Sequence, residues 1–346
     1  MSERLRRAGL LLLGVLVVGW GARHLSAVGA AWSQAWHLIA RLPWQWPVFL
    51  GVVWLLGLCV HTVVLTASMP GLTHRRALTL NLSGSMVSNI LPLGGVAGTV
   101  LNLTMVRGWG HSSPDFARFV VVSKAWDVVA KLFMPLVAVT LLLLWDARPG
   151  HHTALWLAAA AVGAAVGLLL VTALLGRAGP LLRLVTLAER LWGWLRQRMR
   201  RTAPPPDSSP ATGWTDAGAA LLAGTDQLVR RRWAELSWGM AGYWLLQGAL
   251  LWLCLDAIGV HPPLPVVLAG LVAERALTLL AITPGGAGVV EAGTIAVLIA
   301  LGTDPTGALA GVLLFRAFVF AAEIPVGGLA TALWLLTRRS PARAAV

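Results

Sequence analysis

Carboxylates and an arginine flank a helix-breaking turn in the last third of the chain, inside a stretch that is otherwise apolar enough for a membrane. The turn is the run Pro284, Gly285, Gly286, Ala287, Gly288. Glu274 and Arg275 precede this turn, and Glu291 follows it. Lipid offers no partner for the backbone groups that such a turn releases, so the break must lie against protein or water. We therefore interpret the turn as a candidate binding site.

Two further groups of charged residues lie inside apolar runs. Lys124 and Asp127 are three residues apart, so on a helix they share a face and can pair, with Lys131 one turn further on. Arg316 and Glu323 are seven residues apart and also share a helix face. Charges within a bilayer need a partner or water. Two roles remain open, a structural ion pair or contact with an anionic substrate, and the bidentate fork of arginine favours Arg316 for phosphate.

Glu291 lies on the first helical turn after the break, where the helix dipole stabilises a carboxylate. Three roles remain open for it: binding a cationic group of a substrate, relaying a proton, or capping the helix. Together with Asp127 and Glu323 it is also a candidate for coupling transport to a proton or an ion.

The composition indicates a polytopic α-helical membrane protein. The 346 residues have a mean hydropathy of +0.75, 57% are hydrophobic and only 12% are charged, which excludes a soluble globular domain. Both cysteines lie in apolar runs, so neither a disulfide framework nor a metal cluster is indicated. Apolar runs near the length of about 20 residues needed for one crossing occupy 8–22, 47–67, 114–145, 153–175, 236–257, 264–283 and 305–337.

The positions of the cations explain the net charge of +13. Of the 27 lysines and arginines, 18 fall on one side of the expected spans and three on the other. This bias predicts a cell-membrane protein whose amino terminus, carboxyl terminus and linker at 177–232 are cytoplasmic. Within the linker, 180–201 has the pattern of a basic amphipathic helix that lies on the membrane surface. Nucleic acid is therefore not expected as a partner.

Features of the two halves of the chain recur in the same order. A shift of 192 residues places 90–94 on 282–286 and Lys124 on Arg316. Each half has a span, a polar break, a short glycine-rich segment and a long helix with an internal cation. We expect a single membrane domain, 1–346, built from a first repeat at about 45–146 and a second at about 236–338.

The predicted topology makes the repeats inverted, because the span at 47–67 runs inward and its counterpart at 236–257 runs outward. Inverted repeats with broken helices are typical of transporters, whose substrate path lies at the repeat interface. An old duplication without a transport role is the alternative.

Each repeat is expected to contain a re-entrant hairpin. The segment 78–91 contains Asn81, Asn89 and several serines, too many polar groups for a helix that faces lipid. The return segment 99–107 is too short to cross a hydrocarbon core of about 30 Å. We expect this hairpin to enter from the cytoplasm and a second, at 264–301, to enter from outside. Two ordinary spans with small residues at their interface are the alternative. The residues of the first break are Pro92, Gly94, Gly95 and Gly98.

The motif Pro284-Gly285-Gly286-x-Gly288-x-x-Glu291, followed by Gly302 and Arg316, resembles the lysylphosphatidylglycerol synthase transmembrane family. This flippase-type domain occurs alone or fused to an aminoacyl-phospholipid synthase, and the resemblance covers nearly the whole chain. It implies two re-entrant hairpins around a central cavity and a role in moving lipids between leaflets.

The first half departs from the pattern of that family. The family typically has Pro-Gly-x-x-Gly-Glu and later Arg-x-x-Asp. Here Thr99 follows Gly98 where a glutamate is expected, and Lys124-x-x-Asp127 replaces the arginine. The departure is consistent with a different headgroup.

Three functions are compatible with these features. The leading hypothesis is a translocase for an anionic or aminoacylated phospholipid or a lipid-linked sugar, with Lys124 and Arg316 contacting phosphate. The second is an ion-coupled transporter of a small solute. The third is an accessory subunit that docks a lipid-modifying enzyme through the linker. No P-loop, zinc signature or hydrolase elbow is present, and the chain ends at Val346 without room for a transferase domain. We therefore expect neither catalysis nor a cofactor nor a bound metal.

Overall fold

The computed structural model describes residues 32–91, 94–144, 212–278 and 283–338, and within them the chain is helical, with no strand. A short helix covers residues 32–40. The longer helices are α2 (Gln45–Ser68), α3 (His74–Ile90), α4 (Gly94–Gly108), α5 (Ser113–Leu144), α8 (Thr212–Ala257), α9 (Leu264–Thr278), α10 (Val289–Ala300), α11 (Pro305–Arg316) and α12 (Glu323–Arg338). Two irregular turns connect them, the 3₁₀ turn η1 (Pro284–Gly286) and the π-helical turn η2 (Ala317–Ala322).

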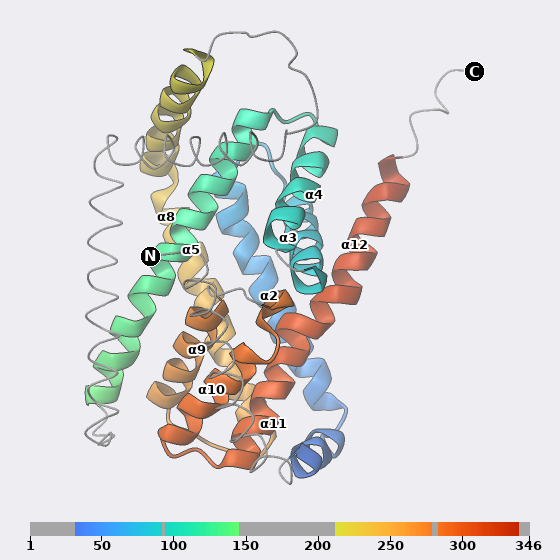
Figure 1. Cartoon of the computed structure of the whole chain (residues 1–346), viewed down its shortest axis with the longest axis vertical. Coiled ribbons are helices and arrows are strands. Elements are labelled where there is room, and N and C mark those ends of the chain that lie inside the picture. Colours follow the sequence, from blue (N-terminus) through green and yellow to red (C-terminus); the bar gives the residue numbers. More distant parts are fainter. Residues whose placement is uncertain (1–31, 92–93, 145–211, 279–282, 339–346) are drawn as a thin grey trace, which may run out of the picture.

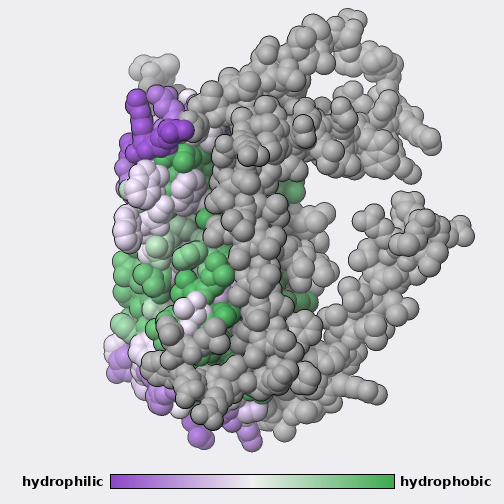
Figure 2. All heavy atoms as spheres, turned by 90° about the vertical axis from the view of Figure 1, so that its left-hand side faces the viewer, coloured by the Kyte–Doolittle hydropathy of each residue, from purple (hydrophilic) through white to green (hydrophobic). Residues whose placement is uncertain are grey.

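Four segments are long and apolar enough to cross a membrane: Gln45–Ser68, Ser113–Leu142, Gln227–Ala257 and Pro305–Thr337. They confirm the expected membrane-spanning, all-helical class. Figure 2 shows the same property on one face, where a hydrophobic band is flanked by hydrophilic residues at both ends. The expected spans at 8–22 and 153–175, and the amphipathic segment 180–201, lie outside the described residues.

Helix α8 is longer than the sequence indicates. Its apolar run begins near residue 236, yet the helix begins at Thr212, so the last part of the expected linker is helical and continuous with the span. The main hydrophobic core lies where α8 packs against α2, and its fully buried members include Leu50, Leu236 and Leu251. Because lipid tails are as apolar as these side chains, close van der Waals packing holds the two helices together.

Two pairs of short helices lie at opposite ends of the long axis (Figure 1). Helices α3 and α4 pack side by side at one end, and α9 packs against α10 at the other. Glycines allow the first pair to approach closely. A Cβ atom on Gly94 would lie 2.5 Å from the carbonyl oxygen of Val87, and one on Gly98 would lie 2.8 Å from that of Gly84. Any larger residue at these two positions would separate the helices.

The second pair is separated by the Pro284 break. Gly285 has a φ of 56°, in the left-handed region that glycine adopts most readily. A side chain there would also collide with Phe320, because its Cβ atom would lie 2.2 Å from Cε2 of that ring. The chain then re-enters a helix at Val289, and the next helix, α11, begins with Asp304 accepting a hydrogen bond from the Gly307 N–H at 2.7 Å.

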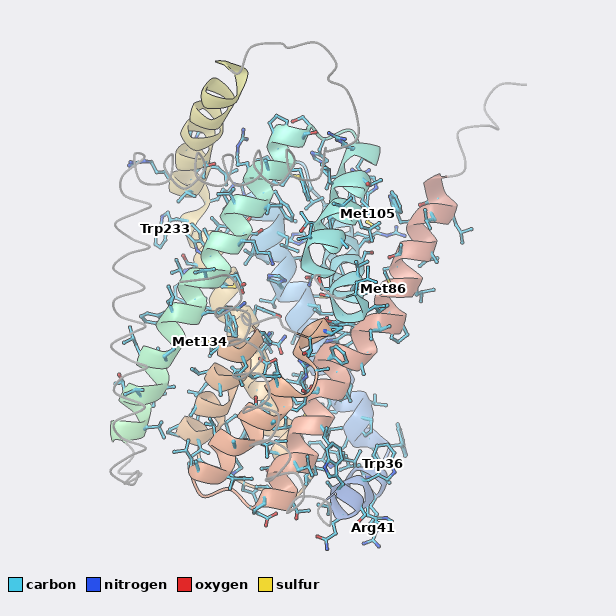
Figure 3. The ribbon with its side chains drawn as sticks, viewed as in Figure 1. Trp36, Arg41, Met86, Met105, Met134 and Trp233 are labelled. Atoms are coloured by element: carbon cyan, nitrogen blue, oxygen red, sulfur yellow. The ribbon has the colours of Figure 1, made fainter. Side chains whose placement is uncertain are left out.

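Cationic residues lie toward the two ends of the long axis. Arg75 and Arg76 lie in the first turn of α3, and Arg338 is the last residue of α12. These two helix ends lie at the upper end of the molecule in Figure 1. Arg41 and Trp36 lie at the lower end (Figure 3). Both ends of the molecule thus carry cations, with a hydrophobic band between them on the face that Figure 2 shows, and the assignment of one end to the cytoplasm stays a prediction.

Candidate functional site

Two polar cavities adjoin at residues of α3, α4, α8 and α9. We call them the Arg316 cavity, of about 500 Å³, and the Lys124 cavity, of about 510 Å³, because each is lined by that residue. The first is bordered mainly by α3, α4, α9 and the Pro284 turn, and the second by α3, α4 and α5. The residues that line both cavities are Ser85, Ser88, Asn89, Gly95, Tyr243 and Arg275.

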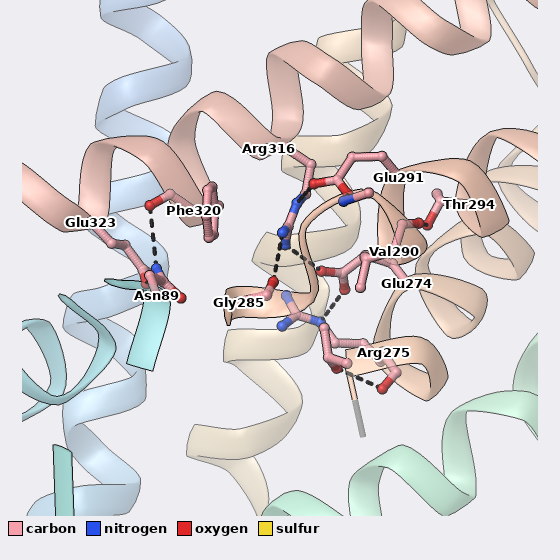
Figure 4. Close-up of polar contacts among 12 residues, drawn as sticks. Asn89, Glu274, Arg275, Gly285, Val290, Glu291, Thr294, Arg316, Phe320 and Glu323 are labelled. Carbon is pink, nitrogen blue, oxygen red and sulfur yellow. Dashed lines mark hydrogen bonds and ion pairs between the residues drawn. The ribbon is translucent and has the colours of Figure 1, made fainter. Parts of the chain in front are cut away.

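Arg316 is buried and bound on all sides (Figure 4). Its Nε donates to Oε1 of Glu291 at 2.6 Å, and its Nη2 donates to the carbonyl oxygen of Gly285 at 2.7 Å. Its Nη1 lies 3.6 Å from Oε1 of Glu274. The ring of Phe320 lies 4.8 Å from the guanidinium carbon. Arg316 therefore fixes the break between α9 and α10, so of the two roles considered for it, the structure shows the ion pair.

Glu291 holds the beginning of α10. Its Oε2 accepts the N–H of Gly288 at 2.6 Å, and its Oε1 binds Arg316. Of the three roles considered for this carboxylate, the geometry shows capping, combined with an ion pair that sequence spacing did not indicate. A carboxylate at a helix amino terminus is favoured by the local dipole, so the cap and the ion pair support each other.

Glu274 and Arg275 form a second buried ion pair at the end of α9. Glu274 is 1% exposed, and its Oε2 lies 2.8 Å from Nε of Arg275. The guanidinium of Arg275 also lies over the ring of Trp244, 4.9 Å from its centre. Its Nη2 is buried and has no hydrogen-bond partner among the described residues. Arg275 thus differs from Arg316 in keeping a free donor at the boundary of both cavities.

The expected ion pair between Lys124 and Asp127 does not form, because Asp127 binds Lys131 instead. Its Oδ2 accepts from Nζ of Lys131 at 2.8 Å. Residues four apart on a helix are as close as residues three apart, so spacing alone did not decide between the two lysines. Lys124 lines its cavity, remains exposed there, and makes no hydrogen bond or ion pair with any described residue. Asn81 lines the same cavity.

A hydrogen-bonded junction joins the first hairpin to the last span. Nδ2 of Asn89 donates to the carbonyl oxygen of Phe320 at 3.3 Å and to Oε2 of Glu323 at 3.4 Å. Arg316 and Glu323 both line the Arg316 cavity but take different partners (Figure 4), and the π-helical turn η2 lies between them. Single π-helical turns are frequent at functional sites, since they redirect side chains within a helix.

Five glycines of the two breaks border the cavities, whereas Pro284 and Gly288 do not. Gly94, Gly95, Gly285 and Gly286 line the Arg316 cavity, and Gly95 and Gly98 line the Lys124 cavity. Pro284 begins η1, and Gly288 precedes α10 as its N-cap. Pro92 lies outside the described residues.

Lys124 and Arg316 do not share a cavity, although the sequence alignment of the two halves indicated a site between them. Arg275 borders both cavities instead. The residue common to both cavities therefore lies on α9, at Arg275, which the sequence identified as a binding candidate beside the break.

Sequence reasoning missed the contribution of α8. Tyr243 lines both cavities and stacks on His61 with ring centres 4.4 Å apart, and Gln247 lines the Arg316 cavity. A signal for these residues existed. Tyr243 is the single tyrosine of the chain, and Gln247 follows four residues later on the same helix face.

Among the described residues, no group of three or more histidine, cysteine or carboxylate side chains has the arrangement of a metal site.

No curated protein matches this sequence significantly. The sequence model of one family, the lysylphosphatidylglycerol synthase transmembrane region, matches residues 8–327. This match covers most of the chain and includes both hairpins and both cavities. The protein therefore belongs to the lysylphosphatidylglycerol synthase transmembrane region family, a group of membrane proteins related to lipid handling.

Proposed function

We propose that this protein is a lipid translocase that moves the headgroup of a phospholipid or a lipid-linked sugar between the two leaflets. The observation that carries the proposal is the pair of adjoining polar cavities that share Arg275 inside an otherwise apolar helical bundle. A headgroup cannot cross hydrocarbon without losing its water, and each unpaired polar group then costs several kcal/mol. Polar walls in the interior replace that water, while the acyl tails stay in the bilayer.

The dimensions of the short helices support two re-entrant hairpins. At 1.5 Å per residue, the 17 residues of α3 extend about 26 Å and the 12 residues of α10 about 18 Å, less than the core thickness of about 30 Å. The hairpins come from opposite ends of the molecule (Figure 1), as expected for inverted repeats. In this proposal α2 corresponds to α8, and α5 corresponds to α11 with α12.

The proposed orientation places the ends of α3 and α12 that carry Arg75, Arg76 and Arg338 in the cytoplasm, following the positive-inside rule. The first hairpin and the Lys124 cavity then open toward the cytoplasm, and the second hairpin enters from outside. The cavities serve transport rather than catalysis in this proposal.

A vesicle experiment tests the function directly. Purified protein is reconstituted into vesicles that contain trace lipids with a fluorescent acyl chain and different headgroups. A membrane-impermeant reagent then reports the rate at which each headgroup reaches the outer leaflet. We expect faster exposure than in protein-free vesicles for at least one anionic headgroup. Equal rates for every lipid tested would overturn the proposal.

One observation favours a second candidate, an ion-coupled carrier of a small solute. Glu323 lines the Arg316 cavity, is 9% exposed, and forms no ion pair with a described residue. Such a carboxylate is suited to exchange a proton during transport. In this alternative, uptake of the solute into vesicles follows an imposed pH gradient and loses that dependence in Glu323→Gln, while lipid exposure stays at the protein-free rate. The accessory-subunit alternative depends on the linker, most of which lies outside the described residues.

A further inference from the structure

The ionisable residues that line the Lys124 cavity are mostly cationic. They are Lys124, Lys131 and Arg275 on the positive side and Asp127 on the negative side, apart from His61 and Tyr243. The carboxylate is already bound to Lys131 at 2.8 Å. A positively charged group that entered this cavity would therefore meet two further cations and no free carboxylate among the described lining residues.

Several polar atoms at this cavity lack a partner among the described residues. Lys124 has no hydrogen bond or ion pair there, and Nη2 of Arg275 is buried without a hydrogen bond. Oδ1 of Asn102, on α4, is also buried and unsatisfied. A buried polar group without a partner costs about 1–3 kcal/mol, and more when it is charged. The solvent-exposed ammonium of Lys124, one unused donor of the ion-paired Arg275, and unpaired polar atoms of Asn102 and His61 thus line a site that a ligand can complete.

The remaining polar wall is uncharged. The first hairpin contributes amides and hydroxyls, and α5 adds one hydroxyl, so the wall can both donate and accept hydrogen bonds. These groups suit hydroxyls on a headgroup. The uncharged polar side chains that line the cavity and belong to these helices include Asn81, Ser85, Ser88, Asn89, Asn102 and Ser123.

The Arg316 cavity has a different charge balance. Its lining includes Arg275, Arg316, Glu274 and Glu323, two cations and two carboxylates. Arg316 is occupied by Glu291, Glu274 and a backbone carbonyl. An anionic headgroup therefore finds a net positive charge in the Lys124 cavity. In the Arg316 cavity the charges balance, Arg316 is occupied, and Glu323 adds a carboxylate without an ion-pair partner among the described residues.

We propose that the Lys124 cavity binds a headgroup that combines a phosphate with uncharged hydroxylated groups, and that it discriminates against headgroups with an added cationic substituent. Lys124 and Arg275 contact the phosphate, and the amides and hydroxyls of the first hairpin contact the hydroxyls. This inference rests on the proposed lipid translocation and names its substrate class. The family description mentions a lysylated lipid, so a preference for the unmodified anionic lipid distinguishes this chain by its own residues.

Binding of short-chain lipids to the purified full-length protein tests this selectivity. The probes are short-chain phosphatidylglycerol, its lysyl ester, and inorganic phosphate, each titrated by calorimetry in detergent. We expect phosphatidylglycerol to bind at least about tenfold more tightly than the lysyl ester, because the added ammonium is repelled by the cations of the cavity. Inorganic phosphate, which lacks tails, is expected to bind at least about a hundredfold more weakly than the lipid.

Variants of Lys124 locate the site. Lys124→Gln should weaken phosphatidylglycerol binding about tenfold, the range of one charge-assisted hydrogen bond. Lys124→Arg should retain the affinity for phosphatidylglycerol. Lys124→Glu should bind the lysyl ester more tightly than phosphatidylglycerol. The matched control is Arg107→Gln, which removes one positive charge from the exposed end of α4, where Arg107 binds Ser113 and lines neither cavity.

Each outcome has one meaning. Equal or tighter binding of the lysyl ester, or no change in Lys124→Gln, overturns the inference. Inorganic phosphate binding as tightly as the lipid assigns the site to a free anion and overturns the lipid class. Selective lipid binding with no headgroup exposure in vesicles supports the selectivity and overturns translocation, so the two proposals fail separately.

Discussion

The two proposed hairpins, α3 with α4 and α9 with α10, carry polar groups of different kinds. Between residues 77 and 106 the first hairpin contains no charged residue, only amides, hydroxyls and glycines in an apolar background. The second hairpin contributes Glu274, Arg275 and Glu291, which form a connected network with Arg316. Charges that are fully paired hold a structure together, whereas uncharged polar groups next to unpaired cations are available to a ligand. We infer that the ion pairs of the second hairpin hold the site in place, and that the polar groups of the first hairpin, together with the free donor of Arg275, form its binding part.

The largest expected effect comes from removing the centre of the charged network. Arg316→Met leaves Glu291 without its ion-pair partner and the buried Glu274 with Arg275 alone. Breaking a buried pair on one side costs about 3–5 kcal/mol, so we expect a large loss of unfolding free energy in detergent. Lys124→Met, which removes a cation without an ion-pair partner among the described residues, should leave stability nearly unchanged. Equal losses in the two variants would remove the distinction between the hairpins.

Alanine at the tip of each hairpin should give the next largest difference. In Gly285→Ala the backbone has a φ of 56° and the new Cβ atom lies 2.2 Å from the ring of Phe320, so we expect a loss of about 1–3 kcal/mol. In Gly95→Ala the new atom meets nothing within 4 Å, and alanine is the better helix former. Thermal unfolding of both proteins checks this. A stable Gly285→Ala protein would show that the turn is not held rigidly.

A smaller effect is expected from Asp127→Asn. Loss of this carboxylate frees Lys131 and makes the Lys124 cavity more positive. We expect binding of short-chain phosphatidylglycerol to strengthen about threefold, since each partly hydrated charge contributes about 1 kcal/mol or less. Asp115→Asn is the control, because Asp115 pairs with Arg118 at 3.7 Å and lines neither cavity. Weaker binding in Asp127→Asn would mean that the carboxylate itself contacts the headgroup.

The smallest expected effect tests the contact between the halves. Asn89→Ala removes two long hydrogen bonds, to Phe320 and Glu323, and should reduce the unfolding free energy by about 1 kcal/mol. Asn81→Ala, on the same helix, removes an amide that lines the Lys124 cavity without a hydrogen bond to a described residue. Chemical unfolding should therefore separate the two, with Asn81→Ala closer to the unchanged protein. A larger loss of stability in Asn81→Ala than in Asn89→Ala would show that the contact of Asn89 with Phe320 and Glu323 does not join the two halves.

Much of the fold follows from local sequence. Four of the apolar runs predicted the described spans closely, whereas the run at 264–283 contains the 15-residue helix α9 and no described span. The proline and glycine residues at 284–288 predicted a break where η1 occurs. Helix breakers and hydropathy act over a few residues, so a single sequence contains that information. The start of α8 was not predicted, because residues 212–235 have the polar composition of a linker. In the structure they are the first part of the same helix.

The partners of the charged residues could not be predicted in the same way. Arg316 binds Glu291, 25 positions away, because η1 and α10 bring that carboxylate to it, whereas spacing favoured Glu323. Asp127 binds Lys131, four residues after it, and not Lys124, three residues before it, although both spacings place the side chains on one helix face. Side-chain partners across helices depend on packing that no local pattern records.

The central claim is that Arg275, shared by the two cavities, lies on the path of the headgroup. The most direct measurement compares headgroup exposure rates in vesicles for the unchanged protein and Arg275→Gln, using Arg107→Gln as a charge-matched control. The double variant Glu274→Gln with Arg275→Gln, which leaves no carboxylate unpaired by the change, guards against a folding defect. The account predicts a fall of at least about tenfold in both Arg275 variants, the loss of one charge-assisted contact, with the control unchanged. Rates equal to those of the unchanged protein in both Arg275 variants would contradict it.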